Sequence, residues 1–361
     1  MKILDWYIFK KFMVTFVFTI LTITIIACVI DTSEKTDDFV KSGLSFTKII
    51  TQYFYGFVPM IISLIFPLIV FISVIFFTSK MSGRSEIVAI LANGVNFNRM
   101  LRPYFIGGFL LAGILWLSNQ FVIPRANGIY ASFKSKYIDN NSSYRLEGNS
   151  NFYLRVNANT FMGIRYYDTT YKSASKFFLE KVKGNQVYYN LRAESIKWDT
   201  ARRKWRIENG VERKINGMKE EVKRVDTVYM DLNVQPMDLR RDQYLKDKLI
   251  TPELDRYISL EELRGSEGLN TLKVERYRRD ATPVAVIILT LIGVVVSSRK
   301  TRGGSGLHLA LGIVVAALFV VMDRFSTVFS TKGDMHPLLA AWIPNLVFGL
   351  VCIFLYRKAP K

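Results

Sequence analysis

The sequence has little of the chemistry on which metal proteins and disulfide-rich proteins depend. Its 361 residues include only two cysteines and two histidines. Cys28 and Cys352 fall in apolar runs near opposite ends of the chain, and His308 and His336 stand at the two ends of one apolar run. A structural zinc site needs about four such ligands together, and a disulfide needs two cysteines with Cα atoms within about 7 Å. We therefore expect neither a bound metal nor a disulfide.

Motifs for nucleotide hydrolysis and for covalent catalysis are also missing. No G-x-x-x-x-G-K-[ST] loop occurs, and the glycine-rich residues 302–306 lack both the lysine and the preceding strand of such a loop. There is no G-x-S-x-G motif and no pair of carboxylates in a convincing context. We therefore expect no enzymatic activity and no cofactor bound by this chain, and if the protein does work, a partner supplies the energy.

Long apolar runs, by contrast, are abundant, and half of all residues are hydrophobic. Six runs reach the length of about 20 residues that a membrane-spanning helix needs. They cover roughly residues 12–30, 57–78, 103–123, 281–298, 307–326 and 337–356. Residues 25–28 also resemble a lipoprotein processing site, which would make residues 1–27 a cleaved signal, but the five further runs favour a first spanning helix. The pattern predicts a multi-pass membrane protein.

Positive charge is the second abundant feature, and the formal net charge is +19. Part of this excess lies before the first run, between runs two and three, between runs four and five, and after run six. Six crossings place all these segments on one side of the membrane, which the positive-inside rule makes cytoplasmic. Both termini are then cytoplasmic, and the large block between runs three and four is periplasmic or extracellular. This placement makes nucleic acid a poor partner; the basic residues of the block could meet anionic lipid or substrate.

The block between runs three and four reads as β structure. Short stretches mix aromatic or β-branched residues with polar ones at 152–167, 177–189 and 191–208. We expect two strands joined around residues 199–204 and a turn at Asn209-Gly210. Many short strands at regular spacing predict a jellyroll, sandwich or barrel-like domain. Residues 252–279 change to a charged helical pattern that returns the chain to the membrane.

The predicted fold class is therefore an α-helical integral membrane protein with six transmembrane helices (3+3) and an inserted all-β, jellyroll-like domain. Residues 1–123 are expected to form transmembrane helices one to three, with residues 31–56 as an outer loop. Residues 124–279 are expected to form the β domain with its helical return segment. Residues 280–361 are expected to form transmembrane helices four to six.

A short stretch, residues 82–94, joins the second and third runs and has the start and stop signals of a helix. Ser82 or Ser85 can cap the amino end, and Glu86 lies where the helix dipole favours negative charge. Gly94 lies where a left-handed residue ends a helix. We expect a helix of about three turns. Because it is held between two spans, force on it would reach both.

The two faces of this expected helix differ. An apolar face follows the helical spacing i, i+3, i+4, i+7 and consists of Ile87, Ile90, Leu91 and Gly94. The apolar side chains could meet a partner or pack against the bundle. The polar residues at the start, which remain to contact water, lipid or a partner, are Arg84, Ser85 and Glu86.

One pair of charges, Asp323 and Arg324, lies inside or at the outer end of the fifth run. Intramembrane charge is costly and is usually functional or paired. Arg324 would suit a cavity that faces acidic lipid phosphates, because a guanidinium binds phosphate in a bidentate manner. The alternative is that Arg324 extends to the outer headgroups with Asp323 as its local partner.

Three passages resemble the lipopolysaccharide export permease family (LptF/LptG, or YjgP/YjgQ type). Residues 84–94, R-S-E-I-V-A-I-L-A-N-G, are similar to its coupling helix S-E-[LI]-x-A-[LM]-x-A-x-G. Residues 275–283, E-R-Y-R-R-D-A-T-P, are similar to its E-x-H-R-R-x-A-x-P, with Tyr277 where histidine is common. Residues 302–306 and 341–345, R-G-G-S-G and A-W-I-P-N, are similar to its R-x-G-G-x-G loop and the A-A-W-x-P-N of span six.

The resemblance implies a transporter subunit of the bacterial inner membrane that acts in cell envelope biogenesis. Its cargo would be lipopolysaccharide, drawn from the outer leaflet and passed along jellyroll domains. The implied partners are a dimeric cytoplasmic ABC ATPase (LptB-like) that uses ATP and Mg, a second homologous permease, and periplasmic bridge proteins (LptC/LptA-like). Residues 84–86 would contact the ATPase. Lys35 and Lys41 lie where the family places basic residues near the substrate, although a solvated loop is the alternative for both.

Two other functions stay open on the sequence alone. A permease for another lipid or for lipoproteins would have a similar layout, with four spans rather than six. A non-transporting membrane anchor for an outer β domain would need no coupling helix at residues 82–94.

Overall fold

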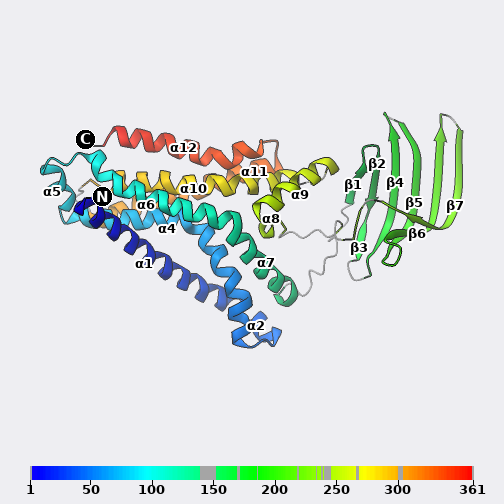
Figure 1. Cartoon of the computed structure of the whole chain (residues 1–361), viewed down its shortest axis with the longest axis horizontal. Helices are drawn as coiled ribbons and strands as arrows, with labels where there is room; N and C mark the ends of the chain where they lie inside the picture. The colour runs from blue at the N-terminus through cyan, green and yellow to red at the C-terminus, as the bar shows by residue number, and fades with distance from the viewer. Residues whose placement is uncertain are drawn as a thin grey trace. The chain divides into compact units, whose positions relative to one another are not determined.

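The computed structural model describes residues 2–138, 152–168, 171–184, 186–217, 219–232, 234–236, 239, 245–265, 268–299 and 304–359 (Figure 1). The chain divides into two compact units. The helical unit comprises Met1–Ile138, Lys246–Leu254 and Asn270–Lys361. The β unit comprises Asp139–Leu245 and Asp255–Leu269.

Six helices in the described residues are long and apolar enough to cross a membrane. They are Ile3–Glu34, Phe46–Gly83, Phe97–Phe133, Leu269–Ser297, Gly306–Lys332 and Pro337–Arg357. Each corresponds to one of the six predicted runs, so the prediction of six spanning helices is confirmed. Length and apolarity alone determine this feature, because a segment that satisfies its backbone in lipid has to be helical.

The helices have the following bounds. The first three spans and their connections are α1 (Ile3–Glu34), α2 (Thr36–Ser42), α3 (Phe46–Lys48), α4 (Tyr55–Gly83), α5 (Glu86–Ala92), α6 (Phe97–Leu117) and α7 (Ile123–Phe133). Wider π-helical turns cover Ile49–Phe54, Ser118–Val122 and Lys134–Ile138. The remaining helices are α8 (Leu245–Lys248), α9 (Thr251–Arg264), α10 (Leu269–Ser297), α11 (Gly304–Lys332) and α12 (Pro337–Arg357).

Two segments outside the predicted apolar runs contain helix. Within residues 31–56, predicted as an outer loop, α1 continues to Glu34, and α2, α3 and a π-helical turn lead into α4. The predicted region of spans one to three ends at residue 123. In the structure, helix continues beyond it through α7, and the helical unit extends to Ile138. Hydropathy marks the part of a helix that lipid can surround, and polar turns can prolong the same helix into water.

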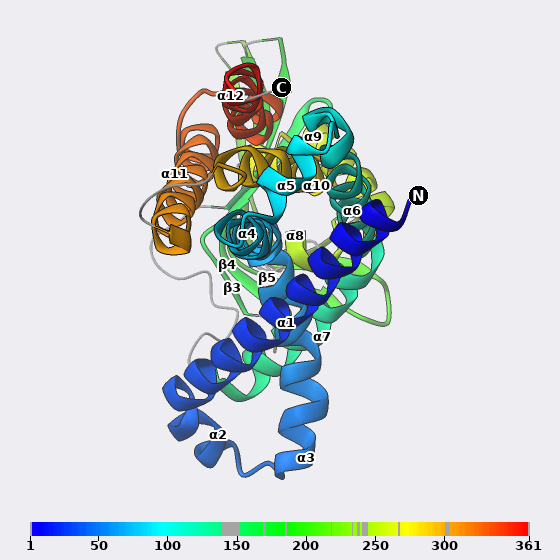
Figure 2. The same ribbon diagram turned by 90° about the vertical axis from the view of Figure 1, so that its left-hand side faces the viewer.

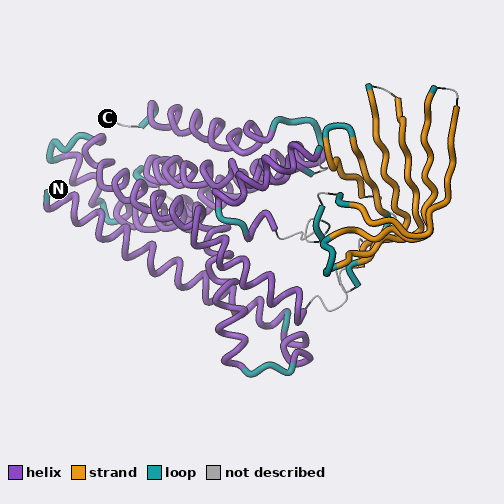
Figure 3. The backbone as a smooth tube through the Cα atoms, turned by 45° about the vertical axis from the view of Figure 1, so that its right-hand side comes forward, coloured by secondary structure: helices purple, strands orange, loops and turns teal. Residues whose placement is uncertain are grey.

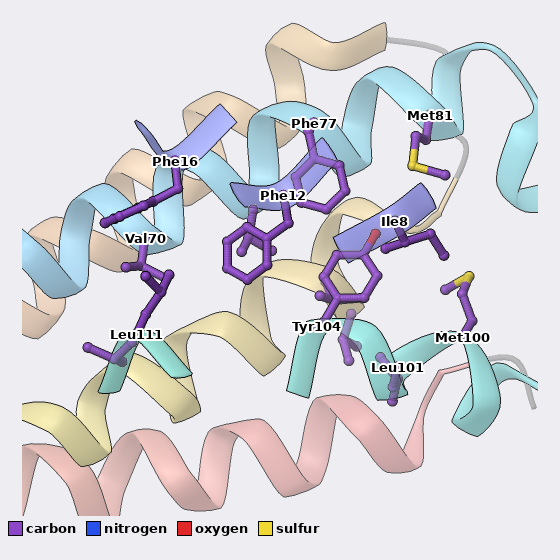
Figure 4. Close-up of a cluster of buried hydrophobic side chains, with 14 of the residues drawn as sticks. Ile8, Phe12, Phe16, Val70, Phe77, Met81, Met100, Leu101, Tyr104 and Leu111 are labelled. Atoms are coloured by element: carbon purple, nitrogen blue, oxygen red, sulfur yellow. The ribbon is translucent and has the colours of Figure 1, made fainter. Parts of the chain in front are cut away.

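The centre of the helical unit lies around α4 and α10, as Figure 2 shows from the end that carries α5. The most apolar stretches of α10 and α4 are 61% and 50% buried, whereas those of α1 and α11 are 6% and 17% buried. In the core, Phe12 of α1 stacks on Phe77 of α4, which in turn stacks on Tyr104 of α6 (Figure 4). Helices α1 and α11 both pack against α4, and most of their apolar surface is left for lipid or another chain.

The β unit contains one antiparallel sheet (Figure 3). Its strands are β1 (Phe152–Asn157), β2 (Thr160–Ile164), β3 (Tyr166–Asp168), β4 (Ser173–Lys183), β5 (Gln186–Asp199), β6 (Lys204–Asn216) and β7 (Lys219–Met230). The order is β1-β2-β4-β5-β6-β7, with β3 also paired to β4. The prediction of an inserted all-β domain is confirmed, as is the turn at 199–204 between β5 and β6.

The predicted turn at Asn209-Gly210 is wrong. Both residues lie inside β6, and Gly210 pairs with Ala193 on one side and Val225 on the other. The local preference of the dipeptide still shows, because Asn209 adopts a φ of 52°. Pairing with two neighbouring strands outweighs the turn preference, and the left-handed residue distorts the strand without ending it.

Trp205 anchors the core of the β unit. It is fully buried, lies opposite Trp198 across β5 and β6, and donates a hydrogen bond from Nε1 to the carbonyl oxygen of Val234 at 2.7 Å. We expect Trp205→Ala to destabilise the sheet by about 3–5 kcal/mol, because it removes a large buried side chain and a hydrogen bond. Hydrogen exchange of β5 and β6 peptides in the full-length protein measures this loss. Trp198→Ala, at the half-buried partner, should cost clearly less, and an equal cost would contradict this assignment.

Candidate functional site

The stretch 82–94 folds as a short helix, α5, between the second and third spans. Glu86 is its first residue, and Gly94 follows its end with a φ of +76°, so both of these predictions are confirmed. The prediction that Ser85 caps the helix with its side chain is wrong. Ser85 has a φ of 61° and makes no side-chain cap, because a capping side chain needs an extended backbone to reach the first amides.

Ser82, the other predicted cap, has a different partner. Its hydroxyl donates to the carbonyl oxygen of Ser298, directly after α10, at 3.2 Å. This bond ties the turn between α4 and α5 to the end of the fourth span. The segment is therefore fixed to a helix that lies more than 200 residues later in the sequence.

The apolar face of α5 points into the helical unit. Ile87 is 1% exposed, and Ile90 and Leu91 pack against the same core. Of the two alternatives for this face, packing against the bundle is the one observed. The exposed face carries Val88, Ala89, Ala92 and Asn93. Their spacing in the sequence marks the face opposite Ile87, and this signal could have identified them.

Glu86 connects α5 to α1. Its Oε2 accepts hydrogen bonds from Tyr7 Oη at 3.1 Å and from Lys11 Nζ at 3.3 Å, and Lys11 also donates to Tyr7. These partially exposed contacts are each worth only about 1 kcal/mol or less. They nevertheless give α5 a contact with the first span in addition to the two spans that it joins. Arg84 lies exposed beside them, at the carboxyl end of α4.

Lys35 does not lie in a solvated loop. It follows α1 directly, and its ammonium donates to Asp31 and to Tyr53, whose hydroxyl donates to Asp31 Oδ2 at 2.6 Å. The ammonium is also 5.1 Å from the ring centroid of Tyr53 and 5.7 Å from that of Phe57. Lys41, by contrast, is exposed on α2. This cage could not be predicted from the sequence, because its members are spread over α1, a π-helical turn and α4.

The partner of Asp323 is not Arg324, as one alternative had it, but Arg278. Arg278 Nη2 lies 2.6 Å from Asp323 Oδ2, and this ion pair joins α10 to α11. Asp323, Arg324 and Arg278 line a cavity of about 170 Å³ whose other walls include Pro67 of α4 and Asn345 of α12. Arg324 is exposed. A carboxylate inside a span is stabilised by a paired cation, and Arg278 fills this role for Asp323. Among the described residues, Arg324 forms no ion pair.

Arg279 fixes the segment that leads back to the membrane. Its buried guanidinium donates to the carbonyl oxygens of Leu249 at 2.9 Å and Lys246 at 3.0 Å, and to Thr251 Oγ1 at 3.1 Å. Asn127 of α7 adds a bond to the carbonyl oxygen of Asp247 at 3.1 Å. Residues 246–251, here named the connector, are thereby held to two spans. Arg279, the third arginine of the passage at 275–283, thus has a structural role that the sequence did not indicate.

Burial and the carboxylate of Glu275 raise the pKa of Asp247 to about 6, although Lys246, Arg279 and Arg278 oppose the shift. The folded connector therefore holds this proton more tightly than the unfolded chain does. Its stability should fall as the pH rises from about 4 to 6, by up to about 3 kcal/mol. Asp247→Asn should remove this dependence and slow hydrogen exchange of the connector at pH 7. Equal exchange profiles of the two proteins across this pH range would contradict the assignment.

A comparison with protein families finds a match over nearly the whole chain. The sequence model of the family described as "Lipopolysaccharide export system permease LptF/LptG" matches residues 6–358. None of the curated proteins compared with the chain matches it. The family match includes all six spans, α5 and the β unit. It makes the protein a transporter subunit and not an enzyme. Because the match covers nearly the whole sequence, the chain belongs to the LptF/LptG family of lipopolysaccharide export permeases.

Proposed function

We propose that this permease is one half of a transmembrane pair that extracts lipopolysaccharide from the bacterial inner membrane and passes it to a periplasmic bridge. A separate ATPase in the cytoplasm supplies the energy, and ATP and Mg²⁺ act in that partner. The observation that carries the proposal is α5. It has an exposed small-residue face and an opposite face that is locked into the spans.

The ATPase is proposed to bind the exposed side of the segment 82–94. That side presents Val88, Ala89 and Ala92, flanked by Arg84 at the start and Gly94 at the end. Small side chains let a groove on a partner approach the helix backbone closely. Ile87, Ile90 and Leu91 would then carry the load inward, because they pack against the bundle core.

Glu86 is proposed to carry the same load to α1. Its bonds to Tyr7 and Lys11 join the segment to the first span, and the hydroxyl of Ser82 joins it to α10. A push on α5 would thus move four spans together. This arrangement supports a role for α5 as a lever that transmits force to the spans. A passive membrane anchor transmits no force and would not need these bonds.

The cargo is proposed to contact the cations at Lys35, Lys41 and Arg324. Lipopolysaccharide carries phosphates, and an exposed guanidinium is suited to binding them. Asp323 would act indirectly, because it neutralises Arg278, and no carboxylate of the described residues pairs with Arg324. Lys35 would exchange Asp31 for a phosphate when cargo arrives.

A second homologous permease is proposed to cover α1 and α11. Only 6% and 17% of their most apolar stretches are buried within this chain, although α11 carries Arg324. A cation on an exposed span is costly beside lipid tails and acceptable in a cavity between two subunits. The end with α5 is proposed to be cytoplasmic and the β unit periplasmic, where it would meet LptC/LptA-like bridge proteins.

The alternative functions are less well supported. Six spanning helices in the described residues count against the lipoprotein-type permease with four spans. The family match supports lipopolysaccharide over another lipid. A membrane anchor would not need α5 to be tied to helices on both sides.

The proposed ATPase contact can be tested by co-purification of the tagged chain from its native membrane in mild detergent. We expect mass spectrometry to find an ABC-type ATPase and a second six-span permease. Val88→Asp should reduce the yield of co-purified ATPase at least tenfold and leave the yield of the second permease unchanged. Val88 is 49% exposed and does not contribute to the core, so the substitution should not disturb the fold. Val40→Asp, on α2, where the side chain is 75% exposed, is the control for an added surface charge. An ATPase yield that is unchanged by Val88→Asp would contradict the proposed contact.

The cargo contact can be tested in proteoliposomes that contain the complex and lipopolysaccharide. Arg324→Ala should lower ATP-driven lipopolysaccharide release at least fivefold, because a phosphate-binding cation is lost. Arg99→Ala, which removes a cation beside the start of α6, should leave release unchanged. If both variants release lipopolysaccharide at the wild-type rate, Arg324 is not a cargo residue.

A further inference from the structure

A second cavity opens between α1 and α4 at the end of the helical unit that carries α5. Its volume is about 460 Å³, and it is separate from the cavity around Asp323 and Arg324. Phe77 and Met81 of α4 line it. Both also belong to the buried core cluster that includes Ile8 and Phe12 of α1 (Figure 4). The site lies where α1 begins and α4 ends, and the lever assigned to α5 does not require it.

The mouth of this cavity is strongly positive. Lys10 and Lys11 come from α1, and Lys80 and Arg84 come from the end of α4 and the following turn. The one carboxylate in the lining, Glu86, is paired with Lys11. Lys10, Lys80 and Arg84 are exposed and have no ion-pair or side-chain hydrogen-bond partner among the residues that the structure describes. Three cations around one opening repel one another, and an anion between them would relieve this repulsion.

Apolar side chains lie one helical turn from the mouth. Val14 follows Lys10 by four residues, and Phe76 precedes Lys80 by four residues, so each cation is stacked over an apolar neighbour on its own helix. Val14 is 60% exposed and Phe76 is 51% exposed. The lining therefore changes from cationic at the ends of α1 and α4 to apolar toward their middles, which matches the order of phosphate and acyl chain in a phospholipid.

The positive-inside rule explains why basic residues occur at this end of the spans. It does not explain why three unpaired cations from two helices surround one cavity. Basic side chains beside a span are also a recognised means of binding anionic headgroups. The apolar residues Val14 and Phe76 of the lining distinguish a lipid from a soluble anion. An acyl chain can pack against them, whereas a free phosphate cannot.

We propose that this cavity binds one anionic phospholipid. The phosphate lies among Lys10, Lys80 and Arg84, and an acyl chain lies along Val14 and Phe76. The bound lipid bridges α1 and α4 beside the contact of Glu86 with Lys11, and so holds the base of α5 in place. The site is distinct from any site for exported cargo and does not depend on the ATPase.

Native mass spectrometry of the delipidated full-length protein tests the site. The probes are phosphatidylglycerol and phosphatidylcholine with identical acyl chains. We expect one phosphatidylglycerol to be retained at a concentration at least fivefold lower than that needed for phosphatidylcholine. Lys10→Ala/Lys80→Ala should abolish this preference. Arg99→Ala/Arg357→Ala, which removes two cations that do not line the cavity, should preserve it.

Two further measurements keep the outcome clear. Arg84 lies outside the spans, so Arg84→Gln should not affect membrane insertion. This variant should also weaken phosphatidylglycerol retention, which separates loss of the site from a defect in insertion of the double variant. Glycerol phosphate should displace phosphatidylglycerol only when its concentration is at least a hundredfold higher than that of the lipid. Displacement by glycerol phosphate at equal concentration would show a soluble-anion site and overturn the proposal. Equal retention of both lipids, or unchanged retention by the double variant and by Arg84→Gln, would overturn it as well.

Discussion

The burial of one face of α5 is the constraint on which the other features of the site depend. A helix of seven residues is too short to be stable alone, because few residues share the cost of forming its first turn. Ile87 is withdrawn almost completely from solvent, and Ile90 and Leu91 join it against the core formed by α1, α4 and α6. Glu86 and Ser82 then add polar bonds to α1 and to the end of α10. Tertiary packing thus makes a rigid element out of a segment that would otherwise be a flexible turn.

The charges of α10 organise the rest of the helical unit. Asp280 accepts hydrogen bonds from Trp116 and Gln120 of the third span and pairs with Arg276, while Arg278 reaches Asp323 of α11. Arg279 holds the connector. A charge is tolerated in a membrane segment when a neighbour neutralises it, so these residues act as fixed joints between helices. Arg324 differs from them, because it is exposed and its neighbour Asp323 pairs with Arg278.

Much of the fold could be predicted from the sequence, because its main determinants are local. Six apolar runs give six spans, a glycine ends α5, and alternating residues give the strands between β4 and β6. The predictions fail where a residue distant in the sequence determines the local conformation or the ion-pair partner. Asn209-Gly210 stays in a strand because two neighbours pair with it, and Asp323 selects Arg278 over the adjacent arginine. The cage of Lys35 and the bonds between Glu86 and Tyr7 join residues 18 and 79 positions apart, which helix periodicity cannot reveal.

Hydrogen exchange of α5 in the purified full-length protein is the most direct test of its anchoring. The amides of Ala89 and Asn93 donate within the helix, to Ser85 and Ala89 respectively, and their exchange reports whether α5 is formed. If burial of Ile87 fixes the helix, both amides should exchange at least a hundredfold more slowly than in a free peptide of residues 82–94, and Ile87→Ala should remove most of that protection. Exchange at the rate of the free peptide would show that α5 is not held by the spans, and the lever would fail with it.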